Sequence, residues 1–139
     1  MRILLWYCEK FSWLPAIKTL IQAPDAQAGE HQQSIVAFIH IEPKDVLEGS
    51  SSATKLLKNL KWLVKKWQCD GTKPKIILHS FTHLGEEKAD ADKARELLNQ
   101  VEIRLKNVDY DVIQTPYGYF LDLDMQAKGH PLARIYKEF

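Results

Sequence analysis

The residue whose type and position best suit chemistry is His83, in the segment Ser80-Phe81-Thr82-His83. It follows an apolar run over residues 75–81 and precedes a helical pattern. Ligands of open α/β sheets bind at the carboxyl ends of strands, so this position favours a ligand-binding histidine. A loop histidine can also cap a backbone group, and the sequence leaves both roles open.

The other histidines have no partner that would give them a chemical role. His40 and His79 lie inside apolar runs, which is typical of buried structural histidines, while His31 is in a polar loop and His130 in a turn. No two of them have the spacing of zinc ligands, and no glycine-rich phosphate loop is present. We therefore expect neither a metal nor another cofactor.

A lysine-rich helix is predicted over residues 51–67. Leu56, Leu60, Leu63 and Trp67 recur at helical spacing on one side. The remaining faces carry five lysines, at positions 55, 58, 61, 65 and 66. Such a face is usually solvated, and because Trp62 and Trp67 are interleaved with the lysines, contact with an RNA backbone is the alternative.

The elements that must position these residues form a layered α/β pattern. Apolar, β-rich runs predict strands at residues 2–8, 34–42, 75–81, 109–115 and 119–127. A second helix is expected to begin at Asp90 or Asp92, with one apolar stripe from Ala94 to Leu105. The expected order is βββ-α-β-α-ββ. Residues 22–33 are expected to form a loop, and the residues after Pro131 a short helical tail.

Composition indicates one ordinary domain. The 139 residues, 45% of them hydrophobic, are enough to bury a core, and the net charge of +1 shows no overall preference for a polyanion. No apolar run approaches the length of about 20 residues that a membrane span needs. Cys8 and Cys69 are too few for a disulfide framework, which predicts a reduced, cytoplasmic setting.

The predicted strand 119–127 lies between two turns. Its side chains alternate, so that Leu121, Leu123 and Met125 share one face, opposite Phe120, Asp122 and Asp124. A Pro-Tyr-Gly-Tyr turn at 116–119 precedes it, and the Gly-His-Pro turn at 129–131 follows it. These turns either bracket an ordinary hairpin strand or shape the mouth of a pocket.

Several segments together give the chain a family resemblance. They are MRILLWYC, IVAFIHIE, FTHL, ARELLNQVEIRLKN, TPYGYF and KGHPLA. The chain resembles the N-terminal editing domain of archaeal threonyl-tRNA synthetases over nearly its whole length, most weakly over 9–33. The resemblance implies one editing domain over residues 1–139 with the fold of D-aminoacyl-tRNA deacylases, in which β-sheet layers accompany two main helices. It also implies a homodimer that hydrolyses serine wrongly attached to the 3′ end of threonine tRNA, without a cofactor.

The resemblance also assigns roles to particular residues. The family holds the seryl group largely through main-chain atoms, which implies a substrate site formed by Ile41, Ser80, Thr82, Tyr117, Gly118 and Tyr119. His83 is then expected beside the terminal adenosine. The 116–119 turn becomes a pocket wall, and the 129–131 turn a support for that wall or for the dimer.

The chain departs from the family pattern at three expected catalytic positions. The family has Tyr-Lys where this chain has Phe120 and Leu121, and an acidic residue where it has Arg134. Leucine cannot move protons, and Arg134 reverses the sign of the local charge. Three interpretations therefore stay open: an editing deacylase, a catalytically impaired tRNA-binding or dimerisation module, and a D-aminoacyl-tRNA deacylase. A synthetase catalytic domain is expected as its partner in cis or in trans.

Overall fold

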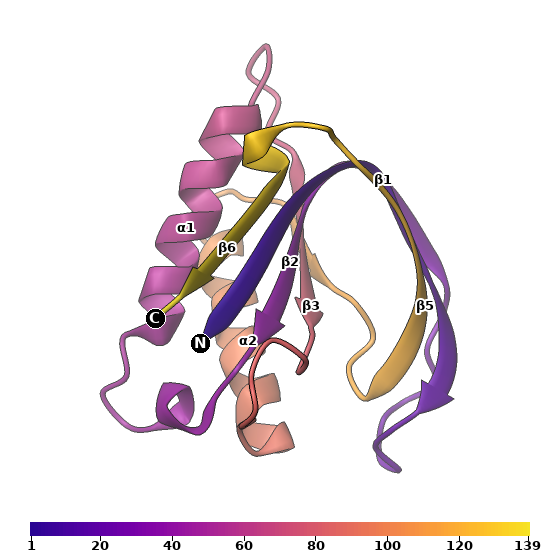
Figure 1. The fold of residues 1–139 in the computed structure, drawn as a ribbon, viewed down its shortest axis with the longest axis vertical. Helices are drawn as coiled ribbons and strands as arrows, with labels where there is room; N and C mark the ends of the chain where they lie inside the picture. Colours follow the sequence, from indigo (N-terminus) through magenta and orange to yellow (C-terminus); the bar gives the residue numbers. More distant parts are fainter.

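A computed structural model describes all residues from Met1 to Phe139 and shows a six-stranded sheet with two helices on one face (Figure 1). The α/β architecture predicted from the sequence is confirmed. The chain runs through β1 (Arg2–Lys18), β2 (Gly29–His40), a 3-10 turn η1 (Pro43–Val46), α1 (Ser52–Trp67), β3 (Lys75–Ser80), α2 (Ala91–Lys106), β4 (Val112–Gln114), β5 (Tyr119–Ala127), a second 3-10 turn η2 (Pro131–Ala133) and β6 (Arg134–Glu138). Neither helix is long and apolar enough to cross a membrane.

The sheet is mixed, and its strand order brings three carboxyl ends together. The order is β4-β3-β2-β1-β5, with β6 pairing the first residues of β1. Strands β2, β3 and β4 are parallel to one another, whereas β1 is antiparallel to β2, β5 and β6. The parallel strands therefore end at one edge of the sheet, where α2 begins (Figure 1).

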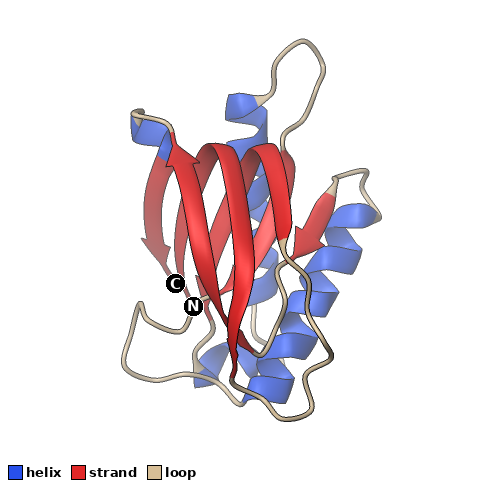
Figure 2. Ribbon diagram, turned by 90° about the vertical axis from the view of Figure 1, so that its right-hand side faces the viewer, coloured by secondary structure: helices blue, strands red, loops and turns tan.

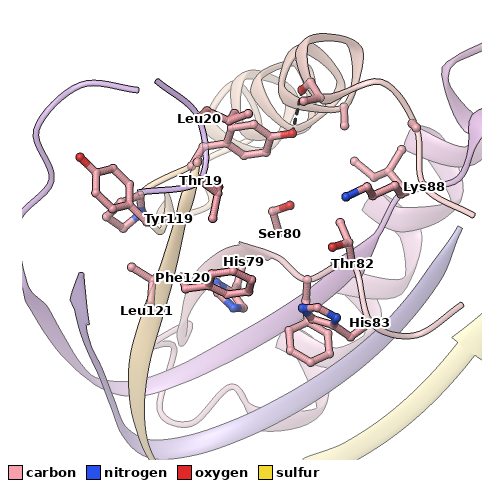
Figure 3. Close-up of a pocket in the computed structure, with 18 of the residues that line it drawn as sticks. Thr19, Leu20, His79, Ser80, Thr82, His83, Lys88, Tyr119, Phe120 and Leu121 are labelled. Carbon is pink, nitrogen blue, oxygen red and sulfur yellow. Dashed lines mark hydrogen bonds between the residues drawn. The ribbon is translucent and has the colours of Figure 1, made fainter. Parts of the chain in front are cut away.

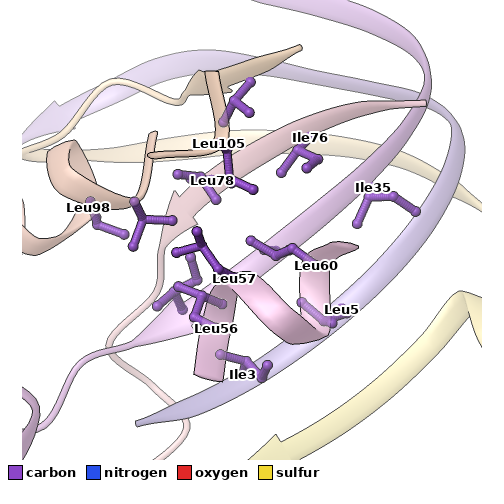
Figure 4. Packing of buried hydrophobic residues seen from close by; sticks show 14 of the residues in the cluster. Ile3, Leu5, Ile35, Leu56, Leu57, Leu60, Ile76, Leu78, Leu98 and Leu105 are labelled. Atoms are coloured by element: carbon purple, nitrogen blue, oxygen red, sulfur yellow. The ribbon is translucent and has the colours of Figure 1, made fainter. Parts of the chain in front are cut away.

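The main core lies between the helices and one face of the curved sheet (Figures 2 and 4). The apolar stripes of both helices pack on the sheet as their spacing predicts, and these buried residues include Leu56, Leu60, Leu98 and Leu105 against Ile3, Leu5, Ile35, Ile76 and Leu78. A smaller cluster lies on the other face, where β5 curls over Phe11, Val36, Phe38 and Ile77. Asp90 caps α2 by accepting hydrogen bonds from two backbone N–H groups, as predicted.

Three sequence expectations are wrong at the ends of elements. The first strand continues to Lys18, and β2 already begins at Gly29, inside the expected loop. The tail after Pro131 has only one 3-10 turn and then forms β6, and two strands instead of the expected three precede α1, so the observed order is ββ-α-β-α-βββ. In each case backbone pairing between distant segments overrides the local polar or proline signals, because residues 10–13 pair with 29–32 and residues 134–138 pair with 2–6.

The 129–131 turn lies away from the carboxyl edge of the sheet. His130 accepts a hydrogen bond from the Leu132 N–H through Nδ1, at 3.0 Å, and its ring packs edge-on against Trp67. The Trp67 indole N–H in turn donates to the Leu132 carbonyl at 3.0 Å. The turn is therefore anchored to the last turn of α1, so the expectation that it supports a pocket wall is wrong, while the alternative that it supports a dimer stays a prediction.

Candidate functional site

A cavity of about 450 Å³ opens at the carboxyl edge of the parallel strands (Figure 3). Its lining comes from the residue after β2, the end of β3 with the following loop, the first turns of α2, and the turn into β5. This volume lies within the range of about 300–1,000 Å³ typical of small-ligand sites. The cavity is thus where an open α/β sheet is expected to bind a ligand.

Nine of the ten residues that the sequence analysis assigned to a site line this cavity. They are Ile41, Ser80, Thr82, His83, Tyr117, Gly118, Tyr119, Phe120 and Leu121. Arg134 does not line it, because its guanidinium lies over the Trp6 ring at 5.8 Å and donates to the Lys128 carbonyl at 2.7 Å. The first nine residues come from three separate stretches of sequence, and only the fold brings them together.

Gly118 shapes the cavity wall formed by the 116–119 turn. Its φ of +86° is in the left-handed region that favours glycine, and an added Cβ would lie 2.9 Å from the Ala23 Cβ. The Gly118 carbonyl accepts the Thr19 N–H at 2.8 Å, which seats the turn on the end of β1. Thr19 and Leu20 therefore also line the cavity, although no local sequence signal marks them.

Two tyrosines fix the same wall. The Tyr117 hydroxyl donates to the Ala91 carbonyl at 2.7 Å, and the Tyr119 hydroxyl donates to the Pro24 carbonyl at 2.7 Å. Burial raises the pKa of Tyr117, so its hydroxyl stays protonated as this bond requires. The turn is thus tied to α2 on one side and to the segment after β1 on the other.

His40 holds the loop that carries His83. Its fully buried ring accepts the Leu84 N–H through Nδ1 at 3.0 Å, which leaves the Nε2 proton to be donated to the Glu87 carbonyl at 2.6 Å. The backbone also closes the loop, since the Ala89 N–H donates to the Ile41 carbonyl at 2.9 Å. The predicted structural role of His40 is confirmed.

His79 forms part of the cavity floor and is a satisfied core histidine, as predicted. Its Nδ1 shares a hydrogen bond with the Thr115 hydroxyl at 2.8 Å. Burial lowers the pKa of His79 to about 4, because the charged ring would lose its hydration. At neutral pH the ring is therefore uncharged.

This burial predicts a loss of stability in mild acid. An unfolded histidine has an ordinary pKa of about 6.5, so the unfolded chain takes up this proton first as the pH falls from about 6.5 toward 4. We expect His79 to cost the fold about 3 kcal/mol across that interval. Urea unfolding of the wild type and of His79→Asn at several pH values measures the effect, and equal pH dependence in both proteins would contradict it.

Lys88 is the only lysine, arginine, aspartate or glutamate that lines the cavity. Figure 3 shows its nitrogen turned toward the space that Ser80 and Thr82 also face. The side chain is exposed and forms no ion pair, so its positive charge is available to an incoming anion. No sequence pattern marks Lys88 as a site residue, since it belongs to a polar Glu-Glu-Lys segment.

The rings of His83 and Phe120 lie nearly parallel at the cavity, 6.3 Å apart between centroids and at 17° between planes. Both side chains are exposed, and flat exposed rings are suited to stacking on a nucleobase. A row of contacts continues from His83 through Phe81 and Phe38 to Trp6, with centroid distances of 5.0, 4.8 and 6.0 Å. Arg134 lies at the far end of this row.

Comparison with known proteins gives the family. Residues 1–139 match the archaea-specific editing domain of threonyl-tRNA synthetase. The chain is 30% identical over 140 residues to a threonine–tRNA ligase of Nitrosopumilus maritimus, covering 99% of this chain and 21% of the relative. It is 26% identical over 137 residues to the corresponding ligase of Methanopyrus kandleri, covering 97% of this chain and 21% of the relative. The chain thus spans about a fifth of the length of these ligases.

A solved structure supports the fold. The c-Myc DNA unwinding element binding protein superposes with a TM-score of 0.69 at 13% sequence identity, covering 100% of this chain and 99% of the other. The chain has the D-aminoacyl-tRNA deacylase-like fold that the sequence resemblance predicted. Matched from its first to its last residue, it belongs to the family of archaea-specific editing domains of threonyl-tRNA synthetase.

Proposed function

We propose that this domain hydrolyses serine from mischarged threonine tRNA. The observation that carries the proposal is the convergence of the nine expected site residues on one cavity. The domain would act in the cytoplasm, where tRNA is charged, with a synthetase catalytic domain in the same chain or in a separate one. Its family supports a role in tRNA editing, and the cavity supports a site for the aminoacylated 3′ end.

Editing is needed because the pocket that attaches threonine to tRNA discriminates only weakly against serine. Serine lacks one methyl group of threonine, and a missing methyl changes binding by only about 1–3 kcal/mol. An editing cavity solves the problem by size, since it admits the smaller serine and excludes the methyl. Here Ala89, Ala91 and the 116–119 turn are among the walls that would meet that methyl.

The cavity favours direct attack by water over a covalent intermediate. None of the hydroxyl groups that line the cavity forms a hydrogen bond with a carboxylate. Of the lining histidines, His79 bonds to the hydroxyl of Thr115, a residue outside the lining. No side chain is therefore arranged as an activated nucleophile. Water would attack the ester carbonyl, backbone N–H groups would stabilise the oxyanion, and the ribose oxygen would leave with a proton to give free serine and tRNA. Lys88 would bind a phosphate of the terminal nucleotides, and His83 with Phe120 would stack on the adenine.

A second candidate, a tRNA-binding module without hydrolysis, is favoured by one observation. Leu121 lines the cavity and can neither move a proton nor carry charge. One assay separates the candidates: release of labelled serine from serylated threonine tRNA, with L-threonyl and D-seryl tRNA as comparisons. We expect release of L-serine alone. Preferential release of D-serine would instead make the domain a D-aminoacyl-tRNA deacylase, and no release would leave the binding module.

His83→Ala tests the cavity itself. We expect it to lower kcat/KM for serine release by about 5- to 150-fold, because the terminal adenosine loses a stacking partner worth about 1–3 kcal/mol. Thermal unfolding should be unchanged, since His83 is exposed. His31→Ala is the matched control, because His31 lies outside the cavity and stacks on Trp13. A collapsed unfolding transition in His83→Ala would show a structural histidine instead.

We also propose that the domain is a homodimer. β5 is an edge strand, and it pairs Phe120 with Ile17 of β1 and Asp122 with Leu14. Ile17 and Leu14 are 63% and 55% exposed, and they form an apolar patch next to the edge, beyond Phe120 at the cavity. Such a patch supports an interface between two copies.

Light scattering at micromolar concentration tests the dimer. We expect a mass twice the 16.1 kDa of one chain, and we expect Ile17→Lys to halve it by placing charge in the interface. Ile103→Lys is the control, since Ile103 is similarly exposed at 57% but lies on α2. A monomeric wild type would contradict the proposal.

A further inference from the structure

Helix α1 concentrates positive charge on one surface. Its 16 residues include five lysines and no acidic residue, so it contributes +5 to a chain whose net charge is +1, which leaves −4 for the rest. Lys137 of β6 joins them, with its nitrogen 5.3 Å from the centre of the Trp62 ring. We call the surface formed by Lys55, Lys58, Lys61, Lys65, Lys66 and Lys137, with Trp62, the lysine face.

The lysines of this face form no ion pairs within the protein. The lysines that do form ion pairs are Lys10, Lys75, Lys106 and Lys128, and none of them belongs to the face. Like charges repel along one helix, so a row of unpaired lysines lowers stability unless an anion neutralises it. The stripe of Leu56, Leu60 and Leu63 explains how α1 packs, but it does not explain the charge of the opposite side.

Trp62 adds an exposed aromatic ring to the lysine face, and solvation of the lysines alone does not account for that ring. Its ring is 39% exposed, and the nitrogens of Lys66 and Lys137 lie 5.9 and 5.3 Å from its centre. An exposed tryptophan among lysines combines a surface on which bases stack with charges that meet phosphates. This combination fits a nucleic acid better than an acidic protein, which offers no base to stack.

We infer that the lysine face binds the sugar-phosphate backbone of the same tRNA whose 3′ end enters the cavity, an inference that rests on the proposed function for the identity of the RNA. Lys55 and Lys66 are 11 residues apart, or about 16 Å along the helix, enough to meet several phosphates. Helices α1 and α2 begin at the same end of the molecule (Figure 1). The cavity lies at that end, because the first turn of α2 lines it. The row of lysines therefore leads away from the cavity along one side of the domain.

The test measures binding of uncharged threonine tRNA by fluorescence anisotropy at several salt concentrations. In Lys58→Gln/Lys65→Gln we expect the Kd to rise about 10- to 100-fold at about 0.1 M salt. The slope of log Kd against log salt should fall by about 2, one for each phosphate that no longer meets a lysine. Glutamine favours helix as lysine does, so the variant should melt like wild type.

The matched control is Lys10→Gln/Lys128→Gln, which removes the same charge from lysines that are paired with carboxylates. We expect it to bind tRNA within about twofold of wild type. Equal affinity of both double variants, or no tRNA binding by wild type, would overturn the inference. So would loss of binding to phosphatidylserine vesicles in the Lys58/Lys65 variant with tRNA binding intact, since the face would then serve a membrane.

Binding and hydrolysis separate this inference from the proposed function. A domain that releases serine but binds tRNA equally well with and without Lys58 and Lys65 refutes only the lysine face. A domain that binds tRNA through the lysine face but releases no serine refutes only the deacylase.

Discussion

Replacing Leu121 with lysine is expected to raise the rate of serine release by about 10- to 100-fold. Leu121 lines the cavity and shares its face of β5 with Leu123, so apolar neighbours can hold the lysine stem while the ammonium reaches the cavity. A well-placed proton-transfer group contributes about 10²–10⁴-fold, and a group added to an unadapted site contributes less. Single-turnover release of labelled serine measures the change.

Arg134→Glu shows whether Arg134 influences this gain. The sequence resemblance places Arg134 among the catalytic positions, but its guanidinium lies over Trp6, outside the cavity. We therefore expect the Leu121→Lys/Arg134→Glu double variant to match the single variant within about twofold, since exposed charges at a distance are screened. A fast wild type with an inert Leu121→Lys variant would show instead that backbone and substrate groups carry the catalysis.

Removing the Asp45 carboxylate is expected to destabilise the fold by about 3–5 kcal/mol. Asp45 is 2% exposed, and its carboxylate lies 2.8 Å from the buried Met1 ammonium. It also accepts hydrogen bonds from the Ser52 hydroxyl and the Glu42 N–H. Asp45→Ala would leave a buried cation short of one partner and two donors without acceptors, which is costly in a low-dielectric interior.

Urea unfolding at neutral pH measures that loss, and Glu9→Ala is its control. Glu9 is also a carboxylate in an ion pair, at 3.2 Å from the Lys128 nitrogen, but both side chains are nearly half exposed. Its removal is expected to change stability by less than about 1 kcal/mol. Similar losses in the two variants would show that the Met1–Asp45 pair contributes no more than a surface pair.

The interior of most elements was predictable, and the predicted ends of α1, β3 and β5 lie within one residue of the observed ones, whereas the ends of β1 and β2 and the fold of the tail were not predictable. Side chains repeat at a fixed period in helices and strands, and a short segment of sequence is enough to show that period. This is why the sequence predicted the leucine stripes of α1 and α2 and the alternation of β5. The extension of β1 through Lys10 and Pro15 was not predictable, because those residues are strand only through pairing with β2 and β5. The same holds for β6, which exists because Arg2–Trp6 offers it an edge.

Part of the candidate site was also predictable from the sequence, and part was not. Motifs marked His83 and the 116–119 turn, and these lie together in the cavity as the resemblance implied. No motif marks Lys88, Thr19 or Leu20. Lys88 reaches the cavity because His40 closes its loop, and Thr19 and Leu20 reach it because Gly118 contacts the end of β1. Arg134 is the opposite case: the family motif marked it as a site residue, but its side chain lies over Trp6, outside the cavity.

The pairing of β1 also sets when the domain can finish folding during its synthesis. One edge of β1 pairs with β2, which is synthesised soon after it, but the other edge is shared by β5 and β6, the two strands of this domain that are synthesised last. Contacts between such distant segments close large loops and make folding slow. A nascent chain that has not reached β5 therefore exposes an unpaired 17-residue edge to other chains, and translational pausing before residue 119 is the stage most open to aggregation.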